Sequence, residues 1–188
     1  MKNGFLKFIL ILFILFSIFG IWLFVDSKDY FEKVDYRNLS LEQRKLFEWQ
    51  SGDTEASLHD RYRSHFADTA YRFPRQMVAK VNLFRNQLII GKLTAKTLRE
   101  ENLEYFIIFC NDTINFTWSE TTWDISESEY YIKLYGKNNK GVGEIYFCLN
   151  NCGMVKSKPF CPAMKFGGLS EIGRERIKQL IENGKNWK

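Results

Sequence analysis

An uncharged apolar run from Phe8 to Val25 constrains this chain more than any other feature of its sequence. The run is at the short edge of the length that a helix needs to cross the roughly 30 Å hydrocarbon core of a bilayer. A helix suits that environment because it satisfies its own backbone hydrogen bonds in lipid. The sequence therefore predicts a signal anchor, a transmembrane helix within residues 1–25.

Two alternatives remain for this run. The first is a signal peptide that is removed, although cleavage prefers small residues and bulky Ile18 lies two residues before the best site at Gly20. The second is a buried core helix, which would rarely be apolar on every face in so small a protein.

The charges around the run predict its orientation. Lys2 and Lys7 precede it, whereas Lys28, Lys33 and Arg37 follow it among four acidic residues. Lys and Arg near a span favour the cytoplasmic side, and only the first flank is purely positive. We expect a single-pass protein of the inner (cell) membrane whose C-terminal domain is extracytoplasmic, in the periplasm or at the cell exterior.

The remaining chain is long enough for one domain with a real core. Its polar, mixed-charge start predicts a juxtamembrane linker over residues 26–39, followed by a single extracytoplasmic domain over residues 40–188. The net charge of +5 among 188 residues is small, and the sequence contains no block of like charges. It is weak evidence for nucleic-acid binding, and we expect none.

Helical patterns dominate the first part of this domain. Ser40 with Gln43 forms a capping box, which predicts a helix start. Further helices are expected over 54–67, over 74–91 as the clearest amphipathic pattern, over 94–101, and from Ser170 to near Gly184.

Strand patterns dominate the second part. Aromatic and β-branched residues predict strands over 103–110, 115–118, 130–135 and 143–149, with a return strand from Met154 and a turn over 136–141. The predicted fold class is α+β: an N-terminal transmembrane helix followed by helices packed on one face of an antiparallel β-meander.

Segments 77–81, 91–98, 130–135 and 144–155 together resemble small bacterial envelope domains of the BamE-like (SmpA/OmlA) type. The resemblance implies two helices joined by a Gly-Lys/Met-Thr turn, then a three-stranded meander whose last hairpin carries an Asn-x-Gly-x-Val element. It also implies a non-catalytic scaffold that binds other envelope proteins, in a group that includes assembly-complex subunits and enzyme inhibitors. The chain departs from this pattern where Arg99-Glu-Glu-Asn-Leu103 replaces Leu-Leu-Gly-x-Pro, and 105–127 is an apparent insertion.

Four cysteines follow the apolar run, at positions Cys110, Cys148, Cys152 and Cys161. An even number in an extracytoplasmic domain predicts disulfides. We favour Cys152–Cys161 around a short loop, with Cys110–Cys148 joining two predicted strands. Four free buried thiols are one alternative, and a zinc site is another, although zinc sites usually contain two close Cys pairs and this chain has one.

The candidate binding residues lie between the predicted strands, where Trp118 and Trp123 alternate with Glu120 and Asp124. Aromatic side chains on such loops often anchor protein partners. Core packing is the alternative for the tryptophans, and a solvated loop or a cation site is the alternative for the acids.

No catalytic motif is recognised, and we expect no cofactor and no metal site. The leading hypothesis is a membrane-tethered, non-catalytic domain that binds a protein partner, and its narrower form is an immunity or inhibitor protein that acts against an exported toxin. One alternative is an envelope assembly scaffold subunit. The other is an envelope hydrolase using Asp60 or His65 with the acidic loop.

Overall fold

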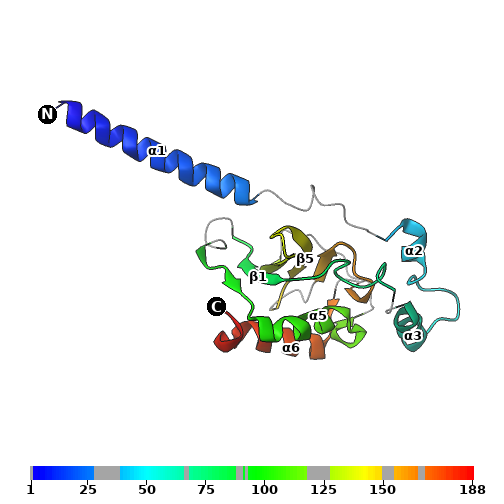
Figure 1. The fold of residues 1–188 in the computed structure, drawn as a ribbon. Helices are drawn as coiled ribbons and strands as arrows, with labels where there is room; N and C mark the ends of the chain where they lie inside the picture. The colour runs from blue at the N-terminus through cyan, green and yellow to red at the C-terminus, as the bar shows by residue number, and fades with distance from the viewer. Residues whose placement is uncertain are drawn as a thin grey trace.

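The computed structural model describes residues 2–27, 39–65, 68–87, 91, 93–117, 128–149, 155–164 and 168–188. It begins with the apolar helix α1 (Lys2–Ser27) and continues into helices and antiparallel strands (Figure 1). The predicted class, a mixture of helices and antiparallel sheet after an N-terminal apolar helix, is confirmed.

Helix α1 stands apart from the other elements (Figure 1). Within it, the segment Gly4–Ile21 is long and apolar enough to cross a membrane, and none of it is buried. The alternative of a buried core helix is therefore wrong, whereas a membrane anchor and a signal sequence both fit this helix. Its orientation in a membrane, the linker over 26–39 and the domain over 40–188 stay predictions.

Two short helices follow at the start of the domain. Helix α2 (Leu41–Lys45) begins at the predicted capping box, in which the Ser40 hydroxyl accepts from the Gln43 N–H and the Gln43 side chain accepts from the Ser40 N–H. Helix α3 (Glu55–His65) buries Leu58 and Tyr62, as its apolar spacing predicts.

The centre of the domain is a five-stranded antiparallel sheet in the order β2-β1-β4-β5-β6. The strands are β1 (Lys80–Arg85), β2 (Lys96–Thr97), β4 (Tyr130–Tyr135), β5 (Gly141–Phe147) and β6 (Val155–Lys158). The β4–β5 hairpin closes at the predicted turn, where Asn139 takes a positive φ of 56° that asparagine tolerates. The hairpin over 130–147 and the return strand at Val155 confirm this part of the predicted meander.

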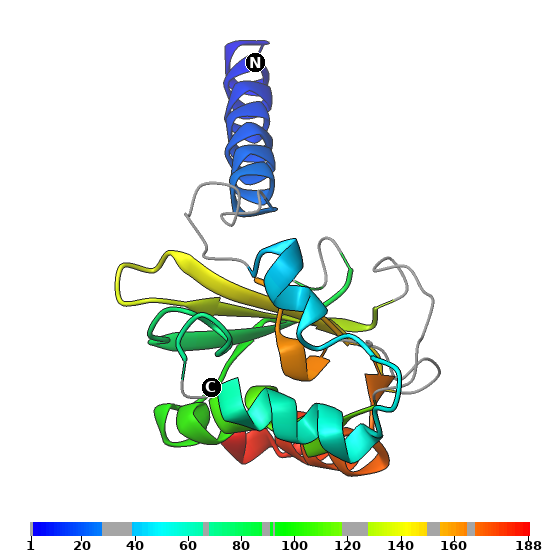
Figure 2. The same cartoon turned by 90° about the vertical axis from the view of Figure 1, so that its right-hand side faces the viewer.

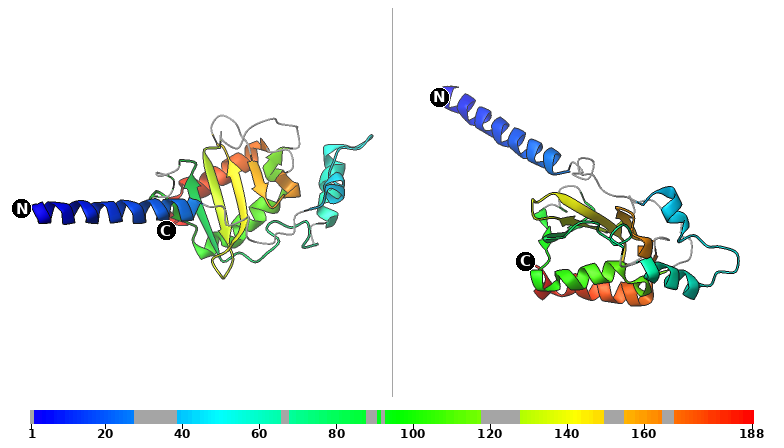
Figure 3. Two further views of the ribbon diagram at one scale, coloured as in Figure 1. Left: turned by 90° about the horizontal axis from the view of Figure 1, so that it is seen from above. Right: turned by 45° about the vertical axis from the view of Figure 1, so that its right-hand side comes forward.

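Alternate residues of a strand point to the same side of a sheet, and the alternate residues on one side of this sheet are mostly apolar. Helices α5 (Leu103–Asn111) and α6 (Glu171–Glu182) run along that side of the sheet (Figures 1 and 3). Side chains from both helices and from three strands line one small interior cavity: Phe106, Phe109, Ile177, Ile132, Ile145, Phe147 and Val155. This cavity marks the centre of the hydrophobic core.

The opposite face is polar and aromatic. Phe84, Tyr131 and Tyr146 stack across neighbouring strands, with ring centroids 4.8 Å and 5.9 Å apart. Beside them, Lys133 lies directly opposite Glu144, and both are buried. Opposite charges in this cross-strand position stabilise the pairing of β4 with β5.

The predicted helix over 74–91 is wrong, because its centre is strand β1. Val81 and Leu83 are buried with Asn82 between them, which is the two-residue period of a strand. Six residue pairs join β1 to β4, from Lys80↔Tyr135 to Arg85↔Tyr130. Pairing with β4 therefore decides a segment whose apolar residues fit both periods.

Two further predictions are corrected in the next segment. The predicted strand over 103–110 is helix α5, in which Phe106, Phe109 and Cys110 are buried at helical spacing. The predicted helix over 94–101 is replaced by strand β2 and the 3-10 turn η2 (Glu100–Asn102). Among the described residues of 77–98, strands β1 and β2 lie in the range for which the envelope-domain resemblance implies two helices, and only Gly91 and Leu93 are helical.

The C-terminal elements complete the helical side of the domain (Figure 2). The short strands β3 (Phe116–Thr117) and β7 (Gly168–Leu169) pair with each other, and Ser170 caps α6 as predicted by accepting from the Gly173 N–H. The remaining 3-10 turns are η3 (Thr113–Asn115), η5 (Pro162–Met164) and η6 (Gly184–Asn186). Beyond η6, Trp187 bridges to Leu98 and donates its indole N–H to the Leu180 carbonyl.

Candidate functional site

The predicted binding residues Trp118, Glu120, Trp123 and Asp124 lie outside the described residues, so their role stays a prediction. The structure describes what flanks them. Before them, β3 pairs with β7. After them, the Glu129 carboxylate accepts from the Leu149 N–H at 2.9 Å, and the Glu129 carbonyl accepts from the Asn86 N–H at 2.9 Å.

The cysteines are not paired as predicted. Cys110 and Cys161 are free thiols and both are buried, so neither Cys110–Cys148 nor Cys152–Cys161 is formed in this structure. The reason is that Cys110 lies on helix α5 rather than on a strand facing Cys148. Cys148 is buried just beyond β5, and Cys152 lies outside the described residues.

The residues of the alternative hydrolase reading have different surroundings. His65 packs edge-on against Tyr71 and Phe47, with ring centroids 5.1 Å and 6.0 Å apart, and its Nδ1 lies 2.8 Å from the Arg61 carbonyl oxygen. Asp60 is exposed on α3. In the described ranges, no three His, Cys, Asp or Glu side chains gather where they could hold a metal ion. The histidine ring thus has a packing role.

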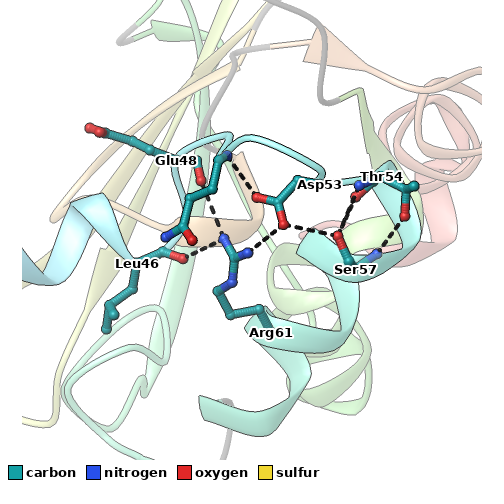
Figure 4. Close-up of polar contacts among 7 residues, drawn as sticks. Leu46, Glu48, Asp53, Thr54, Ser57 and Arg61 are labelled. Atoms are coloured by element: carbon teal, nitrogen blue, oxygen red, sulfur yellow. Dashed lines mark hydrogen bonds and ion pairs between the residues drawn. The ribbon is translucent and has the colours of Figure 1, made fainter.

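A polar cluster fixes the connection between α2 and α3 (Figure 4). Arg61 pairs with Asp53 at 2.6 Å and donates to the carbonyls of Leu46 and Glu48 at 3.0 Å and 3.2 Å. The hydrogen bond from Arg61, reinforced by one from the Gln50 N–H, lowers the pKa of Asp53 below its ordinary value. Each of these donors faces an acceptor. We therefore interpret the cluster as a structural element that holds the connection between α2 and α3 in place, and not as a reactive site.

An open pocket of about 260 Å³ lies between α3 and the end of α5. Its lining is mixed in polarity: Tyr62, Arg63, Ile108, Asn111, Asp112 and Thr113. Small-molecule sites commonly measure about 300–1,000 Å³. The pocket is therefore smaller than a usual substrate site, but it can accept one side chain of another protein.

Exposed apolar side chains lie on α5, on η3 and at the start of α6, and one of them, Ile108, lines this pocket. We name Tyr105, Ile108, Ile114 and Ile172 the helical patch, and their exposed fractions are 48%, 57%, 44% and 47%. Ile108 lines the pocket itself, and the Ser170 hydroxyl at the start of α6 donates to the Ile114 carbonyl, which connects η3 to α6. Exposed apolar groups in one region often mark a protein-binding surface.

Charged groups border the helical patch. Asp112 pairs with Arg176 at 3.3 Å, and both side chains remain partly exposed. Arg63 is exposed on the α3 side of the pocket. An apolar centre with a charged, solvent-accessible rim is the usual anatomy of a protein interface.

Sequence reasoning missed the helical patch because it took 103–110 as a strand. With 103–111 as a helix, Phe106, Phe109 and Cys110 occupy the buried side, while Tyr105 and Ile108 are left over, three residues apart, on the exposed side. Ile172 lies in the first turn of α6 with nearly half of its surface exposed.

In comparisons with known proteins, no family model, no curated protein and no solved structure matches the chain.

Proposed function

We propose that this chain is a membrane-tethered, non-catalytic domain that binds another protein through the helical patch. The exposed apolar side chains around Ile108 carry this proposal, because they remain in water beside a pocket of side-chain size. The apolar helix α1 supports the tether, and its flanking charges favour a domain outside the cytoplasm.

The chemistry of the patch favours an apolar anchor on the partner. A Leu, Ile or Phe side chain would fill the pocket against Ile108, and burial of apolar surface would drive association. Arg63, beside the pocket, would favour a carboxylate next to that anchor. Trp118 and Trp123, which follow β3 in the sequence, stay the predicted aromatic anchors for the same partner.

The identity of the partner separates two forms of the proposal. In the narrower form, the domain inhibits an exported toxin and protects the producing cell. In the alternative, it is a scaffold subunit of an envelope assembly, as its resemblance to BamE-like domains implies. A hydrolase using Asp60 or His65 is the competing enzyme class, and the variants D60N and H65A would abolish its cellular function.

Site-specific photo-cross-linking in the producing cell tests the surface. A benzoyl-phenylalanine at position 108 is expected to give a discrete adduct with one envelope protein on illumination. The control places the same group at Lys137, which is exposed at the β4–β5 turn. Adding I114D to the position-108 probe should remove the adduct, because a charge would then border the anchor.

Two results would overturn the proposal. Equal labelling from positions 108 and 137 would show that the patch has no preferred partner. An adduct with the mass of two copies of this chain would show self-association instead.

A further inference from the structure

Cys110 and Cys161 lie together in the core although 51 residues separate them in the sequence. Cys110 is in the last turn of α5, and Cys161 immediately precedes the turn η5. The Cys161 thiol donates to the Cys110 carbonyl oxygen with a separation of 3.3 Å. This carbonyl belongs to the last turn of the helix, where carbonyls have no intrahelical partner.

We propose that Cys110 and Cys161 form a disulfide in the oxidised domain. By standard bond lengths a carbonyl oxygen lies about 2.4 Å from its own Cα and a cysteine Sγ about 2.8 Å from its own Cα, so this contact keeps the Cα atoms of Cys110 and Cys161 within about 8.5 Å of each other. Disulfides join residues whose Cα atoms are commonly about 5.5–6 Å apart. The contact therefore holds the two residues near each other, and the bond requires Cys161 Sγ to turn from the Cys110 carbonyl oxygen to Cys110 Sγ.

The backbone around Cys161 is held without help from its sulfur. The Cys161 N–H donates to the Ser157 hydroxyl at 2.9 Å, and Arg75 donates to the Phe160 carbonyl at 2.6 Å. The Cys161 carbonyl in turn accepts from the Met164 N–H. None of these three hydrogen bonds uses the thiol, so none is broken when the thiol–carbonyl contact is exchanged for a covalent bond.

The bridge forms by two thiol–disulfide exchanges. One cysteine thiolate attacks the disulfide of an oxidant, such as an envelope dithiol oxidase or oxidised glutathione, and expels one thiolate. The second cysteine attacks the resulting mixed disulfide and expels the other thiolate. The protein loses two electrons and two protons, and the oxidant is reduced to two thiols.

These exchanges precede the completion of folding. Burial, with a further contribution from Cys161, raises the pKa of Cys110, and burial raises the pKa of Cys161 to about 12. The thiolate is the attacking species, so the finished reduced core is unreactive. In a partly folded chain both thiols are exposed to an oxidant. That this folding takes place outside the cytoplasm rests on the proposed function.

Tryptic peptides distinguish the possible pairings without any substitution. Cys110 lies in peptide 100–133, Cys148 and Cys152 share peptide 141–156, and Cys161 lies in peptide 157–165 because trypsin does not cleave between Lys158 and Pro159. A Cys110–Cys161 bridge joins the first peptide to the third and leaves 141–156 separate. Both other complete pairings join all three peptides into one species.

The full chain is first unfolded, reduced and refolded in detergent with a glutathione redox buffer, then alkylated and digested without reduction. Mass spectrometry is expected to find 100–133 joined to 157–165. C110S and C161S should each abolish this species, and C148S should retain it. A single species of all three peptides, or three unlinked peptides, would overturn the pairing.

The same mapping on membranes from the producing cell tests the compartment separately. A linked pair there is expected if the domain is exported. Three alkylated, unlinked peptides from membranes, with the linked pair formed after refolding, would refute the extracytoplasmic placement and leave the pairing intact.

Discussion

The side chain of Asn111 gives the sharpest test of how this fold is held together. Asn111 ends α5, is 4% exposed, and hydrogen bonds both backbone groups of Phe73: its Oδ1 accepts from the N–H at 2.8 Å and its Nδ2 donates to the carbonyl at 2.5 Å. Nδ2 also donates to the Ile107 carbonyl at 2.8 Å. One amide therefore joins the segment before β1 to the helix that carries the helical patch.

The variant N111A removes the partners of two buried backbone groups. Each unsatisfied buried group costs about 1–3 kcal/mol. The Ile107 carbonyl adds little, because it lies in a helix whose carbonyls accept from the N–H four residues later. Asn111 borders the open pocket, so water can reach part of the gap, and we expect a loss near the lower half of the combined range, about 3 kcal/mol.

Thermal unfolding of the full chain in mild detergent, followed by circular dichroism, measures this loss. For a domain of this size about 3 kcal/mol corresponds to a fall in Tm of roughly 6–12 °C. The control N138A changes an exposed asparagine in the β4–β5 turn and should shift Tm little. N111D keeps the acceptor for the Phe73 N–H but loses the donor, so it should also destabilise the protein. Equal Tm values for N111A and N138A would refute the hydrogen-bond reasoning.

Two further predictions follow from packing and charge. A Cβ on Gly173 would lie 1.9 Å from the Asn115 carbonyl oxygen, so G173A should cost about 1–3 kcal/mol by overpacking, whereas G184A has nothing within 4 Å and serves as its thermal-unfolding control. Because the pKa of Asp53 is lowered in the folded state, its pairing with Arg61 stabilises the protein above the ordinary aspartate pKa of about 3.9 and this contribution is lost as pH falls below that value. The difference in the free energy of unfolding between wild type and D53N should therefore be largest near pH 7 and become smaller in acid. A difference that does not depend on pH would contradict this prediction.

Features that depend on a few neighbouring residues were predictable from the sequence. The apolar run forms helix α1 because a helix makes its backbone hydrogen bonds within its own segment and needs no distant partner. Its apolar composition and length are those of a helix that can cross a membrane. The capping box of Ser40 with Gln43 and the Ser170 cap are contacts over three residues. The β4–β5 hairpin follows from its turn and the alternating strands beside it.

Tertiary contacts decided the secondary structure of two segments whose sequences are compatible with either a helix or a strand. Residues 80–85 became a strand because β4 supplies a partner for each of them. Residues 103–111 became a helix because Phe106 and Phe109 on one side complete the core with Phe147 and Ile177 from distant parts of the chain. Aromatic and β-branched composition alone favoured a strand there, since propensity is weaker than packing.

The same division applies to the candidate sites. Sequence could count four cysteines, but only the meeting of α5 with the loop before η5 shows that Cys110 lies against Cys161. The helical patch exists because burial of Phe106 and Phe109 leaves Ile108 outside. Which face of an element is buried depends on residues far away in the chain. For this reason the sequence determined the apolar helix α1 and the local caps, while the tertiary structure decided the exposed patch and the neighbouring thiols.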